Sequence, residues 1–378
     1  MSERFDVIVA GLGAMGSAAA HHLSRDGVRV LGLDRFTPPH ALGSSHGQTR
    51  IIREAYFEHP LYVPLVQRAY VLWEELARET GTELFLQTGG LMIGRPEGVV
   101  YRGAKTSAEL HRLSHEVLSA EEVRRRFPAL RPEPGMAAIL EPRAGILFPE
   151  RCIAAHLAEA GRQGAVLHYD EPLLRWEPSG KDGVRVETTR GRYEAGQLIL
   201  SAGGWLPTLL PHLARHLRIE RQVLFWFQAS QSPEVFRPER CPIHLWEFDD
   251  RHFFYGFPDL GQGIKVACHH DGEFTSPEQV RREVGVEETE AMRRLVRRFL
   301  PGADTPPTSA TVCLYTNTPD EHFWIDRHPE FPQVIIASPC SGHGFKFSSA
   351  VGEVLRDMVQ HRPPALDLSL FKTRWADA

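Results

Sequence analysis

The chain opens with a short apolar strand that runs directly into a glycine-rich turn. The strand spans 5–10, and the turn Gly11-Leu-Gly13-Ala-Met-Gly16 fits the pattern GxGxxG. In this pattern the first glycine permits a tight turn, the second lets a phosphate approach the backbone, and the third lets the next helix pack against the strand. We expect that helix over 14–26, with free N–H groups that would hold a pyrophosphate. The residues expected to contact the phosphates are Gly11, Gly13, Ala14, Met15 and Gly16.

A second strand, 28–33, follows and ends at Asp34. A carboxylate in this position can accept hydrogen bonds from both hydroxyls of a ribose and would repel a 2′-phosphate. The polar loop that leaves this strand would then lie beside the nucleotide, although a plain surface loop is the alternative. The loop residues expected at the cofactor are Arg35, Ser44, Ser45, Thr49, Arg50 and Ile51. Strand, turn, helix, strand and acid in this order predict a dinucleotide-binding unit, but they do not separate FAD from NAD.

The bulk composition argues against several classes of protein. The 378 residues suggest two or three structural units, and a hydrophobic content of 42% is enough to bury a sizeable core. A net charge of −5 without a basic run argues against nucleic acid as a partner, and no apolar run approaches a membrane span. Residues 2–4 lead straight into the first strand, which leaves no room for a signal peptide. The five cysteines match no zinc spacing, so we expect no metal site, free thiols and a reducing cytoplasm.

The chain is expected to leave the dinucleotide-binding unit and to return to it. A strand at 197–200 ends in small residues that let a ligand approach the backbone. Alternating strands between 219 and 270 predict a mostly antiparallel sheet, and helices are expected near 277–300. A strand at 333–338 then ends in a second glycine turn before a helix over 348–360. The residues expected at the cofactor after the first of these strands are Ser201, Ala202, Gly203 and Trp205.

Two glycine turns, one near each end of the chain, suggest a cofactor with two ends to hold. FAD is large enough to span both, whereas NAD normally needs the first turn and its symmetric half-domain, so flavin is favoured. Lys346 fits a bound anion, because the helix dipole disfavours an uncompensated cation at a helix start.

These strands, helices and turns together predict an α/β fold. Its Rossmann-like FAD-binding domain is expected over 1–88, 146–218 and 316–378, and a second, mostly antiparallel sheet-plus-helix substrate domain over 89–145 and 219–315.

Further motifs lie along the rest of the chain. They are Thr49-Arg-Ile-Ile-Arg53, Tyr255-Gly-Phe-Pro258, Cys313-Leu-Tyr315, Asp320-Glu-His-Phe323 and Ser341-Gly-His-Gly-Phe-Lys-Phe-Ser-Ser349. Together with the first glycine turn, they resemble the monomeric sarcosine oxidase family, whose relatives include N-methyltryptophan oxidase and pipecolate oxidase. The resemblance implies FAD bound covalently, through a thioether from Cys313 to the flavin 8α-methyl group. A small buried thiol is the alternative for this cysteine.

The resemblance also implies roles for individual residues. Arg53 and Lys346 would hold the carboxylate of the substrate, and the alternatives are a surface charge and an ordinary residue of a first helical turn. Lys265 would lie close to flavin N5, where a fixed cation stabilises the superoxide formed on reaction with oxygen; a strand lysine that points to solvent is the alternative. The remaining residues implied are His269 and Tyr255, which would orient the substrate, Tyr315 in the pocket, and Gly342, His343, Gly344 and Phe345 in the flavin-facing turn.

The predicted activity is oxidation of the C–N bond of sarcosine or a related N-methyl or secondary α-amino acid to an imine. Hydrolysis of the imine would give glycine and formaldehyde from sarcosine, and oxygen would be reduced to hydrogen peroxide. The enzyme is expected to be a monomer. An oxidase of N-methyltryptophan or pipecolate, a flavin dehydrogenase with another acceptor, a non-catalytic flavin-binding scaffold and an NAD dehydrogenase are the alternatives. Trp246, Trp324 and the loop 56–60 are expected to reshape the entrance of the pocket.

Overall fold

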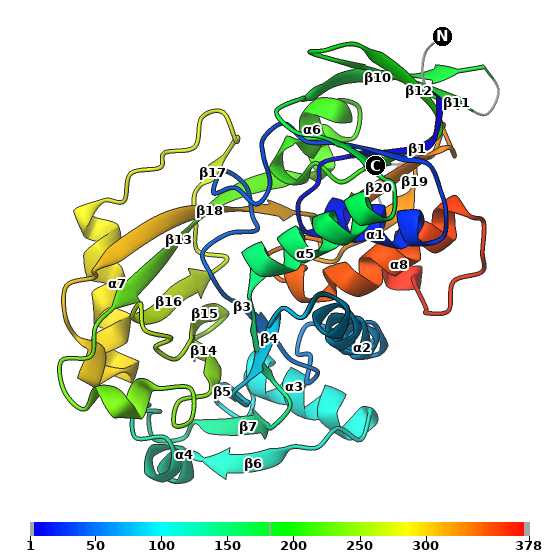
Figure 1. The fold of residues 1–378 in the computed structure, drawn as a ribbon. Coiled ribbons are helices and arrows are strands. Elements are labelled where there is room, and N and C mark those ends of the chain that lie inside the picture. Colours follow the sequence, from blue (N-terminus) through cyan, green and yellow to red (C-terminus); the bar gives the residue numbers. More distant parts are fainter. Residues whose placement is uncertain (1–3, 181–182, 374–378) are drawn as a thin grey trace.

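The structure is a computed structural model that describes residues 4–180 and 183–373. In this part of the chain the strands form two large sheets and one small sheet (Figure 1). The first sheet comprises β1 (Arg4–Ala10), β2 (Val30–Leu33), β9 (Val166–His168), β10 (Leu173–Ser179), β11 (Gly183–Thr188), β12 (Arg192–Leu200), β19 (Trp324–Arg327) and β20 (Val334–Ser338).

Strand β1 lies in the middle of the first sheet, between β2 and β12. Both neighbours run parallel to it, with Val9 opposite Gly32 on one side and Ile199 on the other. Strand β20 extends the parallel part on the far side of β12, and β9 extends it beyond β2. Four successive residues of β1 are buried, which agrees with the apolar run predicted to be covered on both faces.

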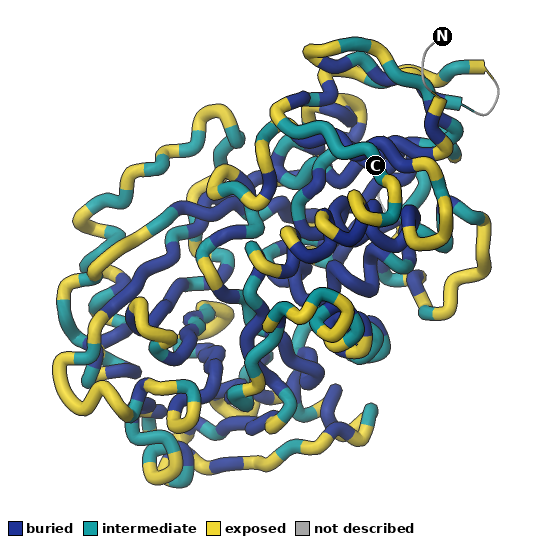
Figure 2. Tube along the Cα trace, viewed as in Figure 1, coloured by how far each residue is buried: buried dark blue, intermediate teal, exposed yellow. Residues whose placement is uncertain are grey.

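Helices α1 (Ala14–Arg25), α5 (Pro149–Arg162) and α8 (Ser348–Val359) pack together beside this sheet (Figure 1). The small residues at the start of α1 allow this contact, because a Cβ atom on Gly352 would lie 2.6 Å from the Ala18 backbone. Figure 2 shows that the trace is buried along α1 and the central strands. Apolar residues of α1 and β1 belong to the largest hydrophobic cluster. The predicted helices over 14–26 and 348–360 are thus present, each ending one residue earlier than expected.

The second sheet is mostly antiparallel, as predicted, although β14 pairs in parallel with β5. A separate hydrophobic cluster covers one of its faces and includes Met292, Val296 and Phe299 from α7 (Val286–Phe299). The sheet comprises β5 (Gly90–Gly94), β6 (Glu116–Ser119), β7 (Ala137–Glu141), β13 (Arg218–Phe227), β14 (Ile243–Asp249), β15 (His252–Gly256), β16 (Ile264–His269), β17 (Phe274–Thr275) and β18 (Ser309–Asn317).

The small sheet joins segments that lie far apart in the sequence. Strand β8 (Gly145–Leu147) lies between β3 (Arg50–Ile52) and β4 (Phe85–Gln87). The other helices are α2 (Tyr62–Thr80), α3 (Val99–Leu110), α4 (Ala120–Arg126) and α6 (Leu206–Leu209). Strands of the first sheet fall within the segments predicted for the FAD-binding domain, and those of the second sheet fall almost wholly within the others. The domain boundaries themselves stay a prediction.

Two expectations were wrong. The helical region predicted near 277–300 contains α7 alone. That helix starts only at Val286, because Gly285 has an extended backbone and forms the N-cap, and its N–H donates to Glu288 Oε2 at 2.7 Å. Trp246 and Trp324 do not shape a pocket entrance. Both are fully buried: Trp246 stacks on Phe299, and Trp324 belongs to the core beside the first sheet.

In the described residues, no helix combines the length and hydropathy needed to cross a membrane.

Candidate active site

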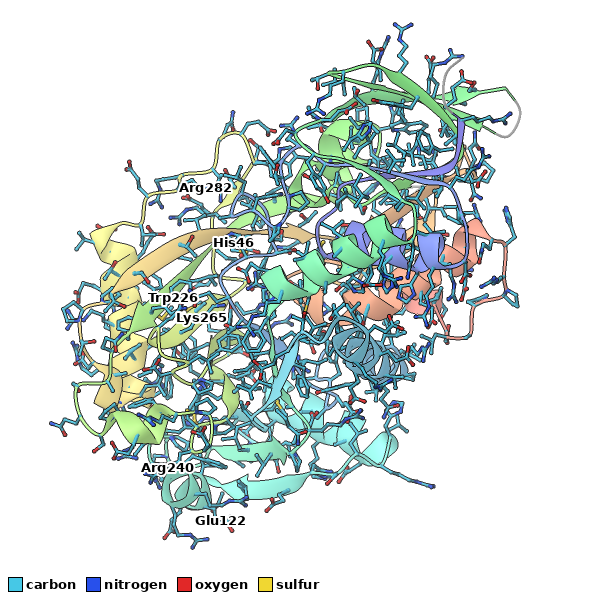
Figure 3. The ribbon with its side chains drawn as sticks, viewed as in Figure 1. His46, Glu122, Trp226, Arg240, Lys265 and Arg282 are labelled. Atoms are coloured by element: carbon cyan, nitrogen blue, oxygen red, sulfur yellow. The ribbon has the colours of Figure 1, made fainter. Side chains whose placement is uncertain are left out.

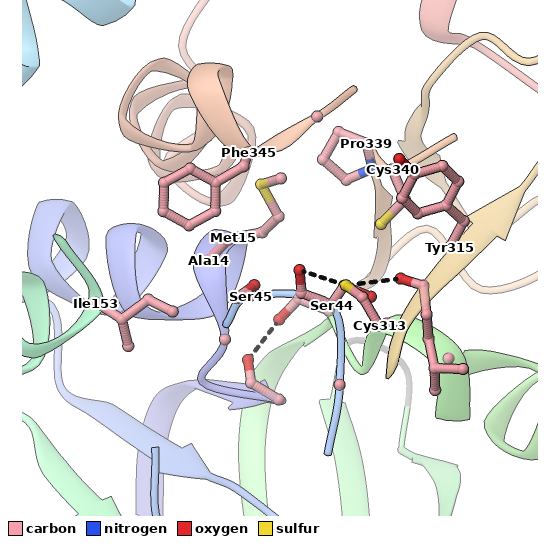
Figure 4. A pocket seen from close by; sticks show the side chains of 18 of the residues that line it. Ala14, Met15, Ser44, Ser45, Ile153, Cys313, Tyr315, Pro339, Cys340 and Phe345 are labelled. Carbon is pink, nitrogen blue, oxygen red and sulfur yellow. Dashed lines mark hydrogen bonds between the residues drawn. The ribbon is translucent and has the colours of Figure 1, made fainter. Parts of the chain in front are cut away.

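A deep cleft lies where the first sheet, the small sheet and the second sheet meet. It encloses about 1860 Å³ of space, open solvent at its mouth included. Its wall contains the turn after β1, the loops after β2 and β12, part of β18 and the turn after β20 (Figure 4). The carboxyl ends of neighbouring parallel strands therefore open into it, which is where ligands bind in open α/β sheets.

Nearly all the predicted site residues lie on this wall, and Gly16 and Lys265 lie behind it. Those that line it are Arg53, Lys346, His269, Tyr255 and Tyr315 from the residues expected at the substrate, together with Gly11, Gly13, Ala14, Met15, Asp34, Arg35, Ser44, Ser45, Thr49, Arg50, Ile51, Ser201, Ala202, Gly203, Trp205, Cys313, Gly342, His343, Gly344 and Phe345 from those expected at the cofactor. The structure thus brings together residues from both ends and from the middle of the chain.

The first glycine turn leaves space in front of its backbone. Gly11 has a φ of +93°, and a Cβ atom there would lie 2.6 Å from the carbonyl oxygen of Ser201. A Cβ atom on Gly16 would overlap the Gly11 carbonyl oxygen. At Gly13, by contrast, a Cβ atom would meet nothing within 4 Å in the described chain. Gly11 and Gly16 therefore permit close packing, and Gly13 leaves the cleft open in front of the backbone. This arrangement fits a pyrophosphate at the start of α1.

Asp34 is held firmly at the end of β2. Its Oδ2 accepts a hydrogen bond from the Leu12 N–H at 2.6 Å, and its Oδ1 accepts one from the Phe36 N–H at 2.9 Å. Burial raises the pKa of this carboxyl, and the two backbone N–H groups oppose that rise. The side chain thus faces the cleft in a fixed orientation, which fits the predicted contact with a ribose.

The second glycine turn packs tightly against β20 and the neighbouring aromatic residues. A Cβ atom on Gly344 would overlap the carbonyl oxygen of Pro339. Gly342 has a φ of +76°, and a Cβ atom there would lie 2.5 Å from Tyr315 and 2.6 Å from His269. The turn therefore sits directly beside both of these side chains at the cleft wall.

Lys346 follows this turn and is buried in the wall. Its Nζ donates to the His343 carbonyl oxygen at 2.7 Å and to the Tyr56 hydroxyl at 3.5 Å. Burial, and then the nearby charge of Arg53, lowers the pKa of Lys346 to about 7. An anion bound here would favour its charged form.

Arg53 is buried and already paired with an acid. Its Nη2 donates to both carboxylate oxygens of Glu58, at 2.7 and 2.8 Å, and its guanidinium lies 4.2 Å from the Tyr56 ring centroid and 4.7 Å from that of Phe57. Glu58 also lines the cleft. The sequence reasoning placed the loop 56–60 near the pocket but missed this pairing. An acid five residues after Arg53, in an aromatic segment, was the available signal.

Cys313 lies on β18 at the cleft wall, with 1% of its surface exposed. Its thiol donates to the Ser44 carbonyl oxygen at 3.4 Å (Figure 4). Arg50 Nη2 donates to the sulfur at 3.5 Å. The Ser44 hydroxyl is buried without a hydrogen-bond partner in the described chain. A sulfur beside a guanidinium and an unsatisfied hydroxyl fit a bound polar group, so the residues here fit the expected cofactor.

Lys265 lies behind the cleft wall rather than on it. Its Nζ donates to three oxygens, the Gly47 carbonyl at 2.7 Å, the Thr49 carbonyl at 2.9 Å and the Thr49 hydroxyl at 3.0 Å. The Trp226 and Phe257 ring centroids lie 5.6 and 4.7 Å from it, and Figure 3 shows Lys265 beside Trp226. Burial, and then Arg50, lowers the pKa of Lys265 well below its ordinary value. The alternative that this lysine points to solvent is therefore excluded.

His269 and Tyr315 are joined on the substrate side of the cleft. His269 Nδ1 and the Tyr315 hydroxyl share a hydrogen bond of 3.1 Å. Burial lowers the pKa of His269 well below its ordinary value and raises the pKa of Tyr255 to about 12. The three side chains are therefore neutral at ordinary pH and act through hydrogen bonds.

The thiols agree with the expectation of free cysteines. All five are unpaired, and Cys340 joins Cys313 on the cleft wall. In residues 4–180 and 183–373, no group of three or more His, Cys, Asp or Glu side chains is placed to hold a metal ion.

Comparison with known proteins identifies the family. Residues 6–358 match the family described as FAD dependent oxidoreductase. Monomeric sarcosine oxidase of Streptomyces avermitilis is 48% identical over 99% of this chain and 98% of its own, and that of a Bacillus species is 40% identical over 98% and 96%. N-methyl-L-tryptophan oxidase of Yersinia pestis is 35% identical over 97% and 98%.

Solved structures agree on the fold. NikD, an amino acid oxidase of nikkomycin biosynthesis, has a TM-score of 0.84 at 24% identity, over 99% of this chain and 98% of its own. L-proline dehydrogenase from P. horikoshii has a TM-score of 0.84 at 20% identity, over 98% and 97%. The chain thus belongs to the FAD-dependent oxidoreductase family, in the group that contains monomeric sarcosine oxidase and N-methyl-L-tryptophan oxidase.

Proposed function

We propose that this protein is an FAD-dependent oxidase of sarcosine or a closely related secondary α-amino acid. The overall reaction would convert sarcosine, water and oxygen into glycine, formaldehyde and hydrogen peroxide. The observation that carries the proposal is the meeting of Arg53 and Lys346 on one cleft wall, beside the second glycine turn. The relatives at 48% and 35% identity, a sarcosine oxidase and an N-methyl-L-tryptophan oxidase, support the same class of substrate.

FAD would be held by the two glycine turns, Asp34 and the loop 43–51, and covalently by Cys313. When bound, it supplies the acceptor for the two electrons removed from the C–N bond. Support for the covalent bond comes from the position of the Cys313 sulfur on the cleft wall, where Arg50 Nη2 contacts it at 3.5 Å.

The substrate carboxylate would lie between Arg53 and Lys346. Arg53 is held by Glu58 and can offer only part of its guanidinium, whereas Lys346 gains a proton as the carboxylate arrives. His269, Tyr255 and Tyr315 would orient the amine from the other side. Their neutral state suits this role, because a neutral side chain does not repel a charged or uncharged amine.

Lys265 would act in the reaction with oxygen. Three oxygen acceptors match the three N–H groups of an ammonium, which favours the charged form against the desolvation that opposes it. A cation fixed in this way stabilises a developing superoxide. Its position behind Thr49 means that the charge would act across the wall rather than by direct contact.

A monomer in the cytoplasm is part of the proposal. The sarcosine oxidases at 48% and 40% identity are named as monomeric, and the unpaired state of all five cysteines fits a reducing compartment.

The decisive experiment is anaerobic mixing of the purified yellow protein with sarcosine, N-methyltryptophan, pipecolate and proline. Loss of the oxidised flavin absorbance with sarcosine, followed by one hydrogen peroxide per turnover when air is admitted, is the expected result. If none of the four bleaches the flavin, the proposed substrate class is wrong. Reduction without peroxide would instead indicate a dehydrogenase.

A further inference from the structure

An acid and a histidine form a buried pair directly behind the substrate side of the cleft. His270 Nδ1 lies 3.2 Å from Glu220 Oε2, and 16% and 4% of the respective side chains are exposed. Neither residue lines the cleft, and none of the motifs in the sequence points to them. They connect β13, which carries Glu220, to the end of β16.

Glu220 has its acceptor sites filled. Oε1 accepts hydrogen bonds from Gln222 Nε2 at 2.6 Å and the Gly272 N–H at 2.9 Å, while Oε2 accepts from Asn317 Nδ2 at 2.5 Å and faces His270. A buried carboxylate with four donors around it stays ionised, and a buried negative charge calls for a positive partner. Burial opposes this state, but the donors win and the pKa of Glu220 lies below its ordinary value.

His270 is the partner and is pressed against the cleft residues. Its ring centroid lies 4.2 Å from that of His269 and 5.4 Å from that of Tyr315. Its backbone has a φ of +56°, a conformation that a non-glycine residue adopts only where the surroundings fix it. Because Glu220 is paired with Tyr315 across the β13–β18 ladder, the acid and the cleft tyrosine project from the same face of the sheet.

Each element packed against His270 presents a titratable or polar group to it. They are Glu220 from β13, Tyr315 from β18, His269 from β16, Glu321 from the loop after β18, and His343 and the Ser341 carbonyl from the second glycine turn. Burial lowers the pKa of His270, but Glu220, Glu321 and Ser341 outweigh it, and the pKa lies above its ordinary value. The adjacent Asp271 is exposed.

We propose that Glu220 and His270 are positioning residues: the carboxylate holds His270 as a cation against His269 and Tyr315, and this cation cancels the repulsion that the buried Glu220 charge would otherwise exert on a substrate carboxylate. The proposal rests on the proposed function, since it assumes that a carboxylate binds beside Arg53 and Lys346. The charge of His270 balances that of Glu220 directly behind the site, and it acts on the substrate through His269 rather than by contact. Loss of His270 alone would leave the Glu220 charge uncompensated and close to the bound anion.

The test measures binding of butanoate, which is sarcosine with a CH₂ group in place of the N–H and therefore cannot be oxidised at a C–N bond. Its dissociation constant is read from the change in the flavin spectrum at pH 7. We expect H270N to weaken binding about tenfold, and E220Q/H270N to return it to within about threefold of the wild type, because the pair is then neutral. The matched control is H252N, which removes an exposed histidine from the same sheet.

A second measurement separates His270 from Lys346, which titrates in the same range. In a K346R background the lysine step is silent, and the dissociation constant of butanoate should still rise as pH climbs through the raised pKa of His270. Adding H270N should abolish that step, and adding H252N should leave it. This comparison also serves if H270N alone loads little flavin, because E220Q/H270N in the same background must lack the step too.

The outcomes divide clearly. Equal dissociation constants of butanoate for H270N and H252N would overturn the proposal. An E220Q/H270N variant that binds butanoate as weakly as H270N would also overturn it, because the effect of H270N would then come from packing rather than from charge. In steady-state assays with sarcosine, H270N should raise KM and leave the anaerobic flavin reduction rate at saturation near that of the wild type. A wild type that binds butanoate but oxidises no amino acid would refute the proposed function and leave this test intact.

Discussion

Replacing Lys346 should change how carboxylate binding depends on pH. The pKa of Lys346 is lowered to about 7 by burial and by Arg53, so most of the lysine is neutral above that pH in the free site. A bound carboxylate restores the charged form. Binding is therefore strongest below pH 7 and weakens as pH rises, because each complex formed above pH 7 must take up a proton.

The magnitude follows from the position of this pKa. If the carboxylate returns the pKa of Lys346 to near its ordinary value of 10.5, the dissociation constant of butanoate should rise about tenfold per pH unit above 7. Half of the lysine is already neutral at pH 7, so between pH 7 and pH 9 the rise amounts to roughly fiftyfold, or about 2.3 kcal/mol of binding free energy. K346R should keep affinity with little of this dependence, since a guanidinium remains charged throughout, and K346M should bind weakly at every pH.

The assay is a spectral titration of the flavin with butanoate from pH 6 to pH 9, repeated by calorimetry in buffers with different heats of ionisation. We expect close to one proton taken up per butanoate at pH 9 and almost none at pH 6. Butanoate is used because the amine of sarcosine has a titration of its own. A wild type whose dissociation constant and proton uptake are independent of pH, or a K346R variant with the same pH dependence as the wild type, would refute the reasoning.

Three shorter predictions concern the cofactor and the fold. C313S should release its yellow colour into the supernatant on acid precipitation, whereas the wild type and C152S, which changes a buried thiol away from the cleft, should retain it in the pellet. G344A should yield little flavin-loaded protein because its methyl group would overlap a backbone carbonyl oxygen, while G161A, which meets nothing within 4 Å in the described chain, should load normally; equal flavin content would contradict this. His22 is neutral in the folded protein, where burial lowers its pKa to about 3. Below about pH 6.5 the unfolded chain therefore binds more protons than the folded chain, and the free energy of unfolding decreases as the pH is lowered. Between pH 7 and pH 5, chemical denaturation of H22Q should show about 2 kcal/mol less loss of stability than the wild type, and identical losses would refute the assignment.

The parts of the fold that the sequence predicts best are those where local pattern and tertiary structure agree. The run 5–16 combines a strand buried on both faces with glycines whose positions are each required by a neighbour, so its local pattern suffices. The capping box at Ser119 is local in the same way, because its two hydrogen bonds lie within four residues. By contrast, aromatic residues carry no signal of which side they face. Trp246 and Trp324 were therefore placed at an entrance although they fill two separate cores.

The candidate site was predictable as a set of residues but not as a network. Motifs led to Arg53, Lys346 and Cys313 individually, since each stands in a distinctive stretch of sequence. What they touch depends on contacts across long sequence separations, and single-sequence patterns do not contain them. The bond from Lys265 to Thr49 and the pair formed by Glu220 and His270 arise only when β13, β16 and the loop 43–50 are folded together.

The central place of β1 has a consequence for how this protein is made. Its neighbour β12 emerges from the ribosome far later, and β20, which pairs with β12, emerges later still. The nascent first strand must therefore wait with one edge unpaired, and an exposed strand edge invites association with other chains. A translation product that stops before β20 would lack both the closing strand and the turn that carries Lys346, so it would be a client for chaperones rather than a smaller enzyme.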